Sequence, residues 1–294
     1  MLSIGDSLMN NLANQITPLH SSKHSPYRHL TTHYEEKHKV GWYFMHATPR
    51  PCFSPELLQD INNWFTQVKQ ELDTKEGRDY RYLVLASDID GTFNLGGDLN
   101  LFRTLIAEGD YNGLLDYAKA CINVLYQNIV HLERNLTTIS LVQGDALGGG
   151  FEAALSSNVL IAERGSKMGL PEILFNLFPG MGAYSLLSRR VGSAKAEQMI
   201  LSGQLYSAEE LYELGVVDIL AEKGEGELAL LAYIKRAEHA SNGYRAMREV
   251  KDICNPLSYQ ELLDITTIWV EAALRLEKRD LRMMERLVSR QNSK

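Results

Sequence analysis

Two short apolar segments of the chain are each followed directly by a glycine-rich turn and then by a helical pattern. The first covers residues 82–86, and the turn after it reads Phe-Asn-Leu-Gly-Gly-Asp-Leu over residues 93–99. The second covers residues 138–142 and precedes Gly144 and the glycine triplet 148–150. Short apolar runs bounded by glycines are typical of buried strands, and strands that alternate with helices favour a parallel sheet. The chain is therefore expected to have an α/β core.

The flanking segments extend this pattern. β-Branched and aromatic residues on both sides of a polar stretch predict a β-hairpin over residues 30–47. Ser54, Pro55 and Glu56 follow the order of an N-cap, a first helical residue and a first-turn acid, which predicts a helix start. Beyond residue 183 the pattern is almost wholly helical, so we expect a C-terminal helical extension.

The chain of 294 residues shows neither an internal repeat nor a low-complexity linker between two domains. Residues 1–30 are polar and lack periodicity, which is typical of a flexible arm. We expect this arm to precede a core over residues 31–220 and a helical region over residues 221–294.

The charge and the apolar runs exclude several classes of protein. The formal net charge is −7, whereas a nucleic-acid-binding protein needs a basic face. No apolar run reaches the roughly 20 residues of a membrane span, and no basic segment at the N-terminus resembles a secretory signal. Neither nucleic acid nor a membrane is therefore expected as a partner, and a cytoplasmic location is predicted.

The metal-binding residue types are present but poorly placed for a metal site. Cys52, Cys121 and Cys254 form no CxxC pair, and an odd number of cysteines suits a reducing compartment, so three buried structural thiols are expected. Six of the eight histidines lie in the first 46 residues, but a strand pattern would scatter them over two faces. No metal site is expected.

The two glycine-rich turns allow two interpretations. Glycines let the backbone approach a ligand closely, and two such turns can direct two N–H donors at one oxygen, as in an oxyanion hole. A tight turn without a ligand is the alternative. Neither turn contains the GxGxxG or GxxxxGK[ST] pattern of a nucleotide-phosphate site.

Two glutamates occur in apolar surroundings near these turns. Glu152 follows the glycine triplet, and Glu172 lies in the segment Gly-Leu-Pro-Glu-Ile-Leu-Phe. A buried carboxyl group must be paired, hydrogen-bonded or shifted in pKa. Each glutamate alone could be a structural acid, but together they form a candidate general acid/base pair next to a carbonyl group.

These segments resemble the crotonase (enoyl-CoA hydratase/isomerase) superfamily. FNLGGDL, VQGDALGGGFEAAL, LPEILFNLFPGMGAY and SAEELYELGVVD carry the likeness. The longer segments LVLASDIDGTFNLGGDL and GLPEILFNLFPGMGAYS are most similar to the diffusible signal factor synthases, which make cis-2-unsaturated fatty acids for quorum sensing. The resemblance implies a crotonase-like ββα spiral core with a C-terminal helical extension.

The resemblance also implies the catalytic residues. The backbone N–H groups of Gly97 and Gly149 would form the oxyanion hole, and Glu152 and Glu172 would be the two carboxyl groups of a hydratase. Retention of both acids favours adding or removing water. Two features depart from the usual pattern, since LGGD replaces AGAD and ATPRPCFSPELL stands where a coenzyme A segment is usual.

The implied substrate is a 3-hydroxyacyl chain on acyl carrier protein. The enzyme would dehydrate it to the cis-2-enoyl thioester and then hydrolyse the thioester to the free cis-2-unsaturated fatty acid, with no cofactor. The resemblance further implies a partner sensor kinase and a trimer-based homo-oligomer. An enoyl-CoA hydratase of fatty-acid oxidation and a non-catalytic binding protein are the alternatives.

The acyl chain of such a substrate needs an apolar tunnel, for which the C-terminal helical region offers candidates. The substrate-binding residues expected there are Trp269, Leu276, Met284 and Leu287, with Ile268, Ala272 and Met283 beside them. The alternative is that these residues pack the tail or form a subunit contact.

Overall fold

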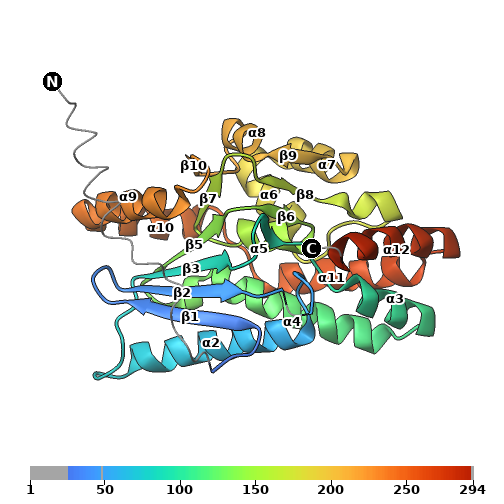
Figure 1. Cartoon of the computed structure of the whole chain (residues 1–294), viewed down its shortest axis with the longest axis horizontal. Coiled ribbons are helices and arrows are strands. Elements are labelled where there is room, and N and C mark those ends of the chain that lie inside the picture. The colour runs from blue at the N-terminus through green and yellow to red at the C-terminus, as the bar shows by residue number, and fades with distance from the viewer. Residues whose placement is uncertain (1–25, 48, 293–294) are drawn as a thin grey trace.

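The computed structural model describes residues 26–47 and 49–292, with side chains described as far as residue 286. Most of the predicted flexible arm, residues 1–25, lies outside the described residues. The described chain forms two β-sheets surrounded by helices (Figure 1).

The larger sheet has six strands in the order β1-β2-β3-β5-β7-β10. The predicted hairpin is confirmed, since β1 (Leu30–Glu35) pairs antiparallel with β2 (Val40–Met45). The other neighbours are parallel, as expected for strands joined through helices. These strands are β3 (Tyr82–Ser87), β5 (Thr137–Val142), β7 (Val159–Glu163) and β10 (Ile219–Ala221).

The smaller sheet, in the order β4-β6-β8-β9, was not predicted from the sequence. Its strands are β4 (Thr92–Asn94), β6 (Asp145–Leu147), β8 (Lys167–Gly169) and β9 (Leu205–Ser207). Three residues are too few to show the alternation of apolar and polar side chains by which a strand is recognised. The first three strands are parallel, and β9 is antiparallel to β8.

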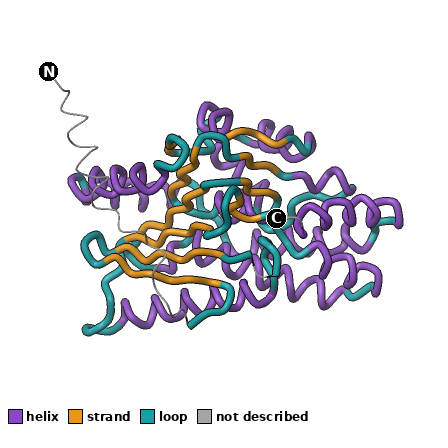
Figure 2. Tube along the Cα trace, in the orientation of Figure 1, coloured by secondary structure: helices purple, strands orange, loops and turns teal. Residues whose placement is uncertain are grey.

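Successive units of the chain repeat one path through the two sheets. Each of β3, β5 and β7 leads into a short strand of the smaller sheet and then into a helical segment (Figure 2). This path confirms the predicted ββα spiral. The helical segments are α3 (Leu99–Glu108) with α4 (Tyr111–Ile129), α5 (Gly149–Leu155), and the 3-10 turn η3 (Pro171–Phe175) with α6 (Ala183–Val191).

Helix α2 (Pro55–Asp73) covers one face of the larger sheet together with α4 (Figure 1). Its predicted start is confirmed, because the Ser54 hydroxyl accepts a hydrogen bond from the Leu57 N–H at 3.2 Å. Its apolar face is buried against the core through Leu57, Leu58, Ile61, Trp64, Phe65 and Val68. The opposite face of the sheet is covered by α9 (Gly226–His239), through Leu230 and Ile234.

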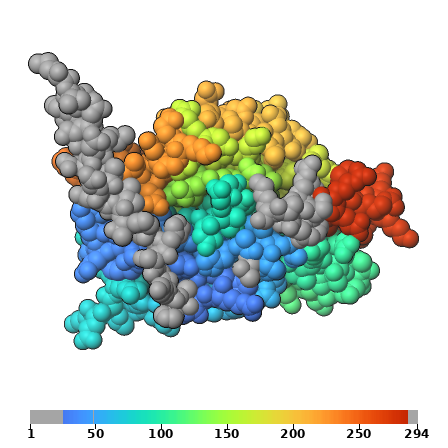
Figure 3. Space-filling view, viewed as in Figure 1, coloured from blue at the N-terminus to red at the C-terminus, as the bar shows by residue number. Residues whose placement is uncertain are grey.

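The remaining helices follow the spiral. They are η2 (His131–Glu133), α7 (Ser193–Ser202), α8 (Ala208–Glu213), α10 (Ser241–Cys254), α11 (Tyr259–Leu274) and α12 (Lys278–Asn292). Helix α11 packs on α4, and α12 lies beside α3 at one end of the molecule (Figure 3). The expected C-terminal helical extension therefore shares the main hydrophobic core through Leu262, Trp269 and Met284.

The three cysteines differ in burial. Cys52 and Cys121 are buried, but Cys254 is exposed on α10, so the prediction of three buried thiols is wrong for Cys254. Among the described residues, no helix combines the length and apolar character needed to cross a membrane.

Candidate active site

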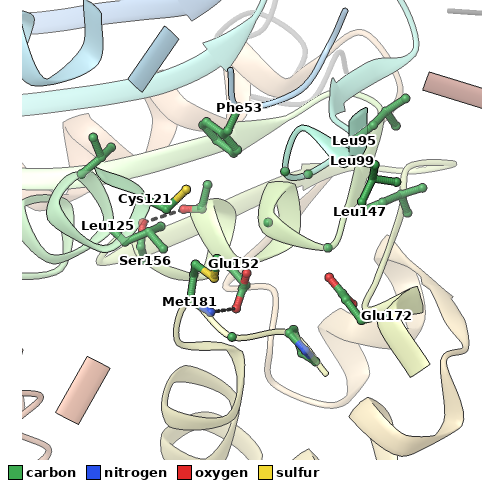
Figure 4. Close-up of a pocket in the computed structure, with 18 of the residues that line it drawn as sticks. Phe53, Leu95, Leu99, Cys121, Leu125, Leu147, Glu152, Ser156, Glu172 and Met181 are labelled. Carbon is green, nitrogen blue, oxygen red and sulfur yellow. Dashed lines mark hydrogen bonds between the residues drawn. The ribbon is translucent and has the colours of Figure 1, made fainter. Parts of the chain in front are cut away.

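The three parallel strands of the smaller sheet bring the predicted catalytic residues to one edge. Gly97 follows β4, Gly149 and Glu152 follow β6, and Glu172 follows β8. Because parallel strands end at a common edge, residues from three distant segments of the chain meet there. Figure 4 shows the carboxyl groups of Glu152 and Glu172 on the wall of one pocket.

The two glycine-rich turns lie against each other. A Cβ placed on Gly149 would lie only 3.4 Å from the backbone nitrogen of Gly97. Gly148 has a φ of +54°, and a Cβ there would lie 2.6 Å from Oε1 of Glu172. Glycine at position 148 therefore permits both the turn and the approach of the second glutamate.

Several hydrogen bonds fix the first turn to the segment before α2. The Phe53 N–H donates to the Gly96 carbonyl at 2.8 Å, and the Leu95 N–H donates to the Pro51 carbonyl at 2.7 Å. The Arg50 guanidinium donates to both carboxyl oxygens of Asp98 at 2.8 and 2.9 Å. These contacts hold the backbone of Gly97 in place beside Gly149.

Glu152 is buried, with 2% of its surface exposed. Its Oε1 accepts hydrogen bonds from the Met181 N–H at 2.9 Å and from the Ala183 N–H at 3.0 Å. Burial raises the pKa of Glu152 to about 7, and the two backbone donors oppose that rise by stabilising the carboxylate. Glu152 can therefore exchange a proton near neutral pH.

Glu172 lies in a less hydrogen-bonded environment. Its Oε2 is buried and has no hydrogen-bond partner among the described residues. Burial, followed by repulsion from the Glu152 carboxylate, raises the pKa of Glu172 to about 8. The negative charge of Glu152 is therefore close enough to disfavour ionisation of Glu172.

A cavity of about 190 Å³ begins beside these groups, with room for roughly a dozen water-sized groups. Its outer wall includes the exposed Leu174 and Leu205, with 53% and 41% of their surfaces accessible. Its inner wall is buried and comes mainly from α2 and α4, through Leu58, Ile61, Phe65, Tyr117, Cys121, Val124, Leu125 and Asn128. The cavity is therefore a largely apolar tunnel with the glutamates between its mouth and its inner end.

Of the tunnel residues predicted from the sequence, only some line this cavity. Trp269 lines it and packs edge-to-face on Phe102 at 5.0 Å between ring centroids. Leu276 and Met284 do not line it, which corrects their predicted placement. Leu276 follows the end of α11 and packs on the rim of the core, while Met284 is buried on α12, which packs on α3 and η3. The side chain of Leu287 lies outside the described part of the chain.

The sequence did not predict that residues of α2 and α4 line the tunnel. Their apolar spacing correctly predicted amphipathic helices, but a side chain that lines a cavity has the same pattern as one that fills a core. The Asn128 side chain on an otherwise apolar helix face was the one available signal.

The family model described as enoyl-CoA hydratase/isomerase matches residues 45–284. A probable enoyl-CoA hydratase of Bacillus subtilis is 26% identical over 71% of this chain and 76% of its own length. A peroxisomal fatty acid beta-oxidation multifunctional protein of Arabidopsis thaliana is 31% identical over 52% of this chain, which spans only 20% of that protein.

A solved structure supports the same fold at low sequence identity. The enoyl-CoA hydratase from Bacillus halodurans superposes with a TM-score of 0.73 at 18% identity, covering 88% of this chain and all of that one. The family model covers most of the chain, including every strand of the smaller sheet and both glutamates. The chain therefore belongs to the enoyl-CoA hydratase/isomerase family.

Proposed function

We propose that this protein is a lyase that removes water from a 3-hydroxyacyl thioester. The observation that carries the proposal is a pair of glutamates beside two converging glycine turns, Glu152 buried and Glu172 half-buried with its Oε2 buried, whose pKa values are raised to about 7 and about 8. General acid/base chemistry at neutral pH needs groups that exchange protons near that pH. The long apolar tunnel suits the acyl chain of such a substrate.

In this proposal the thioester oxygen accepts hydrogen bonds from the N–H groups of Gly97 and Gly149. Glu152 acts as the base, because the donors of Met181 and Ala183 stabilise its carboxylate form. Glu172 acts as the acid, because its higher pKa keeps it protonated at neutral pH.

The proposed dehydration conserves atoms and electrons. The C2–H bond breaks, and its proton moves to Glu152 while its electron pair forms an enolate that the oxyanion hole stabilises. The enolate collapses to a C2–C3 double bond, the C3–O bond breaks, and Glu172 gives its proton to the leaving hydroxyl. Water leaves, and the two carboxyl groups return to their starting states by proton exchange with solvent.

The finer assignment is to the diffusible signal factor synthases. We propose that the acyl chain arrives on acyl carrier protein, that the product is a cis-2-enoyl thioester, and that the same oxyanion hole supports its hydrolysis to the free acid. The segments LVLASDIDGTFNLGGDL and GLPEILFNLFPGMGAYS support this assignment, as does ATPRPCFSPELL in place of a coenzyme A segment. A sensor kinase partner and a trimer-based assembly belong to the same proposal.

The alternative is an enoyl-CoA hydratase of fatty-acid oxidation, which the names of the Bacillus subtilis and Arabidopsis relatives favour. One experiment separates the two. Purified protein is given 3-hydroxydecanoyl acyl carrier protein or crotonyl-CoA, and the products are identified by mass spectrometry. Release of a free cis-2-enoic acid from the carrier protein supports the synthase, whereas hydration of crotonyl-CoA without release of acid supports the hydratase. Turnover of neither substrate contradicts both.

A further inference from the structure

The inner end of the tunnel is polar, although most of its wall is apolar. Tyr43 on β2, Asn128 on α4 and Ser156 at the end of α5 all line the cavity there and are at most 4% exposed. We call these three residues the floor cluster. Figure 4 places Ser156 near Cys121 and Leu125 on one side of Glu152, with Leu95, Leu99 and Leu147 on the other side.

Every donor hydrogen of the floor cluster is already used. The two Asn128 amide hydrogens go to Ser156 Oγ at 2.8 Å and Ser157 Oγ at 2.9 Å. The Tyr43 hydroxyl donates to Asn128 Oδ1 at 3.2 Å, and the Ser156 hydroxyl donates to the Ala153 carbonyl at 2.7 Å. A tyrosine and a serine each have one donor hydrogen, and an asparagine side chain has two, so none remains. The oxygens of the cluster retain unused lone pairs.

Helix α5 sets the distance between this floor and the reacting carbon. Gly149, Glu152 and Ser156 all line the cavity and lie at i, i+3 and i+7, which is one face of a helix. The seven residue-to-residue steps from Gly149 to Ser156 correspond to about 10 Å along the axis, the length of roughly eight carbon–carbon bonds in an extended chain. A chain of that length, held by its carbonyl at Gly149, ends at the floor cluster.

We propose that the floor cluster selects acyl chains of about ten carbons that carry a hydroxyl group near their far end, and that it disfavours an end that only accepts hydrogen bonds. The inference rests on the proposed function for the position of the thioester carbonyl. A hydroxyl group can donate to the unused lone pairs, a methyl group leaves them unpaired, and a carbonyl group adds a further acceptor.

The test uses decanoic acid, 9-hydroxydecanoic acid and 9-oxodecanoic acid as a matched set of ligands. Their affinities are measured by isothermal titration calorimetry for the wild type, Ser156→Ala and Ser157→Ala. The wild type should bind the hydroxy acid about tenfold more tightly than decanoic acid, the size of one hydrogen bond, and the oxo acid most weakly. Tighter binding of decanoic acid than of the hydroxy acid would overturn the proposal.

The two serine variants give the matched control. Both serines accept from Asn128 and both are buried, but only Ser156 lines the cavity. Ser156→Ala removes an acceptor and frees one Asn128 N–H toward the tunnel, so the oxo acid should gain affinity and approach the hydroxy acid. Ser157→Ala should keep the wild-type order. If both variants changed the three affinities equally, the cause would be a general loss of packing around Asn128, and the proposal would be contradicted.

Ligand binding and turnover separate the failure of this inference from the failure of the proposed function. If no thioester is turned over but the free acids bind in the predicted order, the floor cluster keeps its role and the dehydratase proposal fails. If 3-hydroxyacyl thioesters are dehydrated but the three acids bind equally, the reaction stands and the inference is overturned.

Discussion

Glu152 and Glu172 are acidic side chains whose folded surroundings favour the protonated form. Burial raises both pKa values above the usual 4.5, to about 7 and about 8. The unfolded chain therefore releases these two protons at lower pH than the folded chain does. Their contribution to stability is greatest below pH 4.5 and is lost as pH rises toward 8.

The glutamine variants should show this pH dependence directly. Glu172→Gln removes the ionisation, so its free energy of unfolding should exceed that of the wild type at pH 8 and match it at pH 4, below the unfolded pKa of 4.5. Urea denaturation at the two pH values measures the difference, and the exposed Glu108→Gln serves as a control. A difference from wild type that is the same at both pH values would contradict the assigned cause.

The same variants should lose activity. Gln keeps the size of the side chain but cannot exchange a proton, so Glu152→Gln and Glu172→Gln should each lower the rate of dehydration by about 10²–10⁴-fold. Because the two groups act as a unit, the double variant should be scarcely slower than the slower single one. Near wild-type rates in either single variant would exclude the paired mechanism while leaving the fold assignment intact.

Substitution by alanine should have different effects at Gly149 and Gly150, two neighbouring glycines of the triplet. A Cβ on Gly149 meets nothing closer than 3.4 Å and points at the Gly97 nitrogen, whereas a Cβ on Gly150 would lie 2.1 Å from the Asn94 carbonyl oxygen. Gly149→Ala should keep its melting temperature and lose activity, because the methyl group occupies the space of the thioester oxygen. Gly150→Ala should unfold at lower temperature. Normal turnover in Gly149→Ala would show that the active site does not lie at the glycine triplet.

At the scale of elements, α11 supports the loop that holds Glu152. Thr266 on α11 donates from Oγ1 to the Gly180 carbonyl at 3.1 Å. The same loop supplies the Met181 and Ala183 donors to the glutamate. Helix α11 therefore acts on Glu152, the proposed base, through the backbone of residues 180–183.

Thr266→Val removes this support without changing the shape of the side chain much. The loop donors should then bind the Glu152 carboxylate less well, so its pKa should rise further and the acid limb of the pH profile of kcat/KM should move to higher pH, by up to about one unit. Thr267→Val is the control, because the Thr267 hydroxyl donates only to the Leu263 carbonyl of its own helix. If the pH profile of kcat/KM were unchanged in Thr266→Val, Thr266 would have only a packing role.

The sequence predicted these elements unevenly. The helix start at Ser54 and the buried strands β3 and β5 follow from local rules of capping and apolar runs, and they were found. The strands of the smaller sheet were missed because three residues show no period. The two glutamates were singled out because an acid among apolar residues stands out, and the structure brings both to one cavity, while their catalytic role stays a prediction. Leu276 and Met284 were misplaced because an apolar pattern gives the buried face of a helix but not the neighbour it faces.

At the scale of the whole molecule, α10 has an apolar face that no other part of residues 26–47 and 49–292 covers. It has no buried residue, and Met247, Val250 and Ile253 are exposed at 65%, 48% and 78%. An exposed apolar stripe on an amphipathic helix is typical of a surface that another protein covers. The trimer-based assembly proposed above predicts that a second copy of this chain covers this face.

Light scattering tests this contact. The wild type should have a mass that is a multiple of the 33.2 kDa chain, and Val250→Asp with Ile253→Asp should reduce it toward the monomer without changing the circular dichroism spectrum. Tyr212→Asp, at an exposed position on α8, is the control that should leave the mass unchanged. A monomeric wild type at micromolar concentration would refute the prediction.

The spiral path has a consequence for how such a site can diversify. Each turn of the spiral supplies one part: Gly97 follows β4, Gly149 and Glu152 follow β6, and Glu172 follows β8. An insertion or substitution within one turn of the spiral alters the site residues of that turn. The strand pairing of the other turns keeps their site residues in place. If the proposed roles hold, evolution can retain the glycine pair that stabilises an anion and replace a glutamate that carries a proton, so that one architecture gives rise to different reactions by separate, local changes.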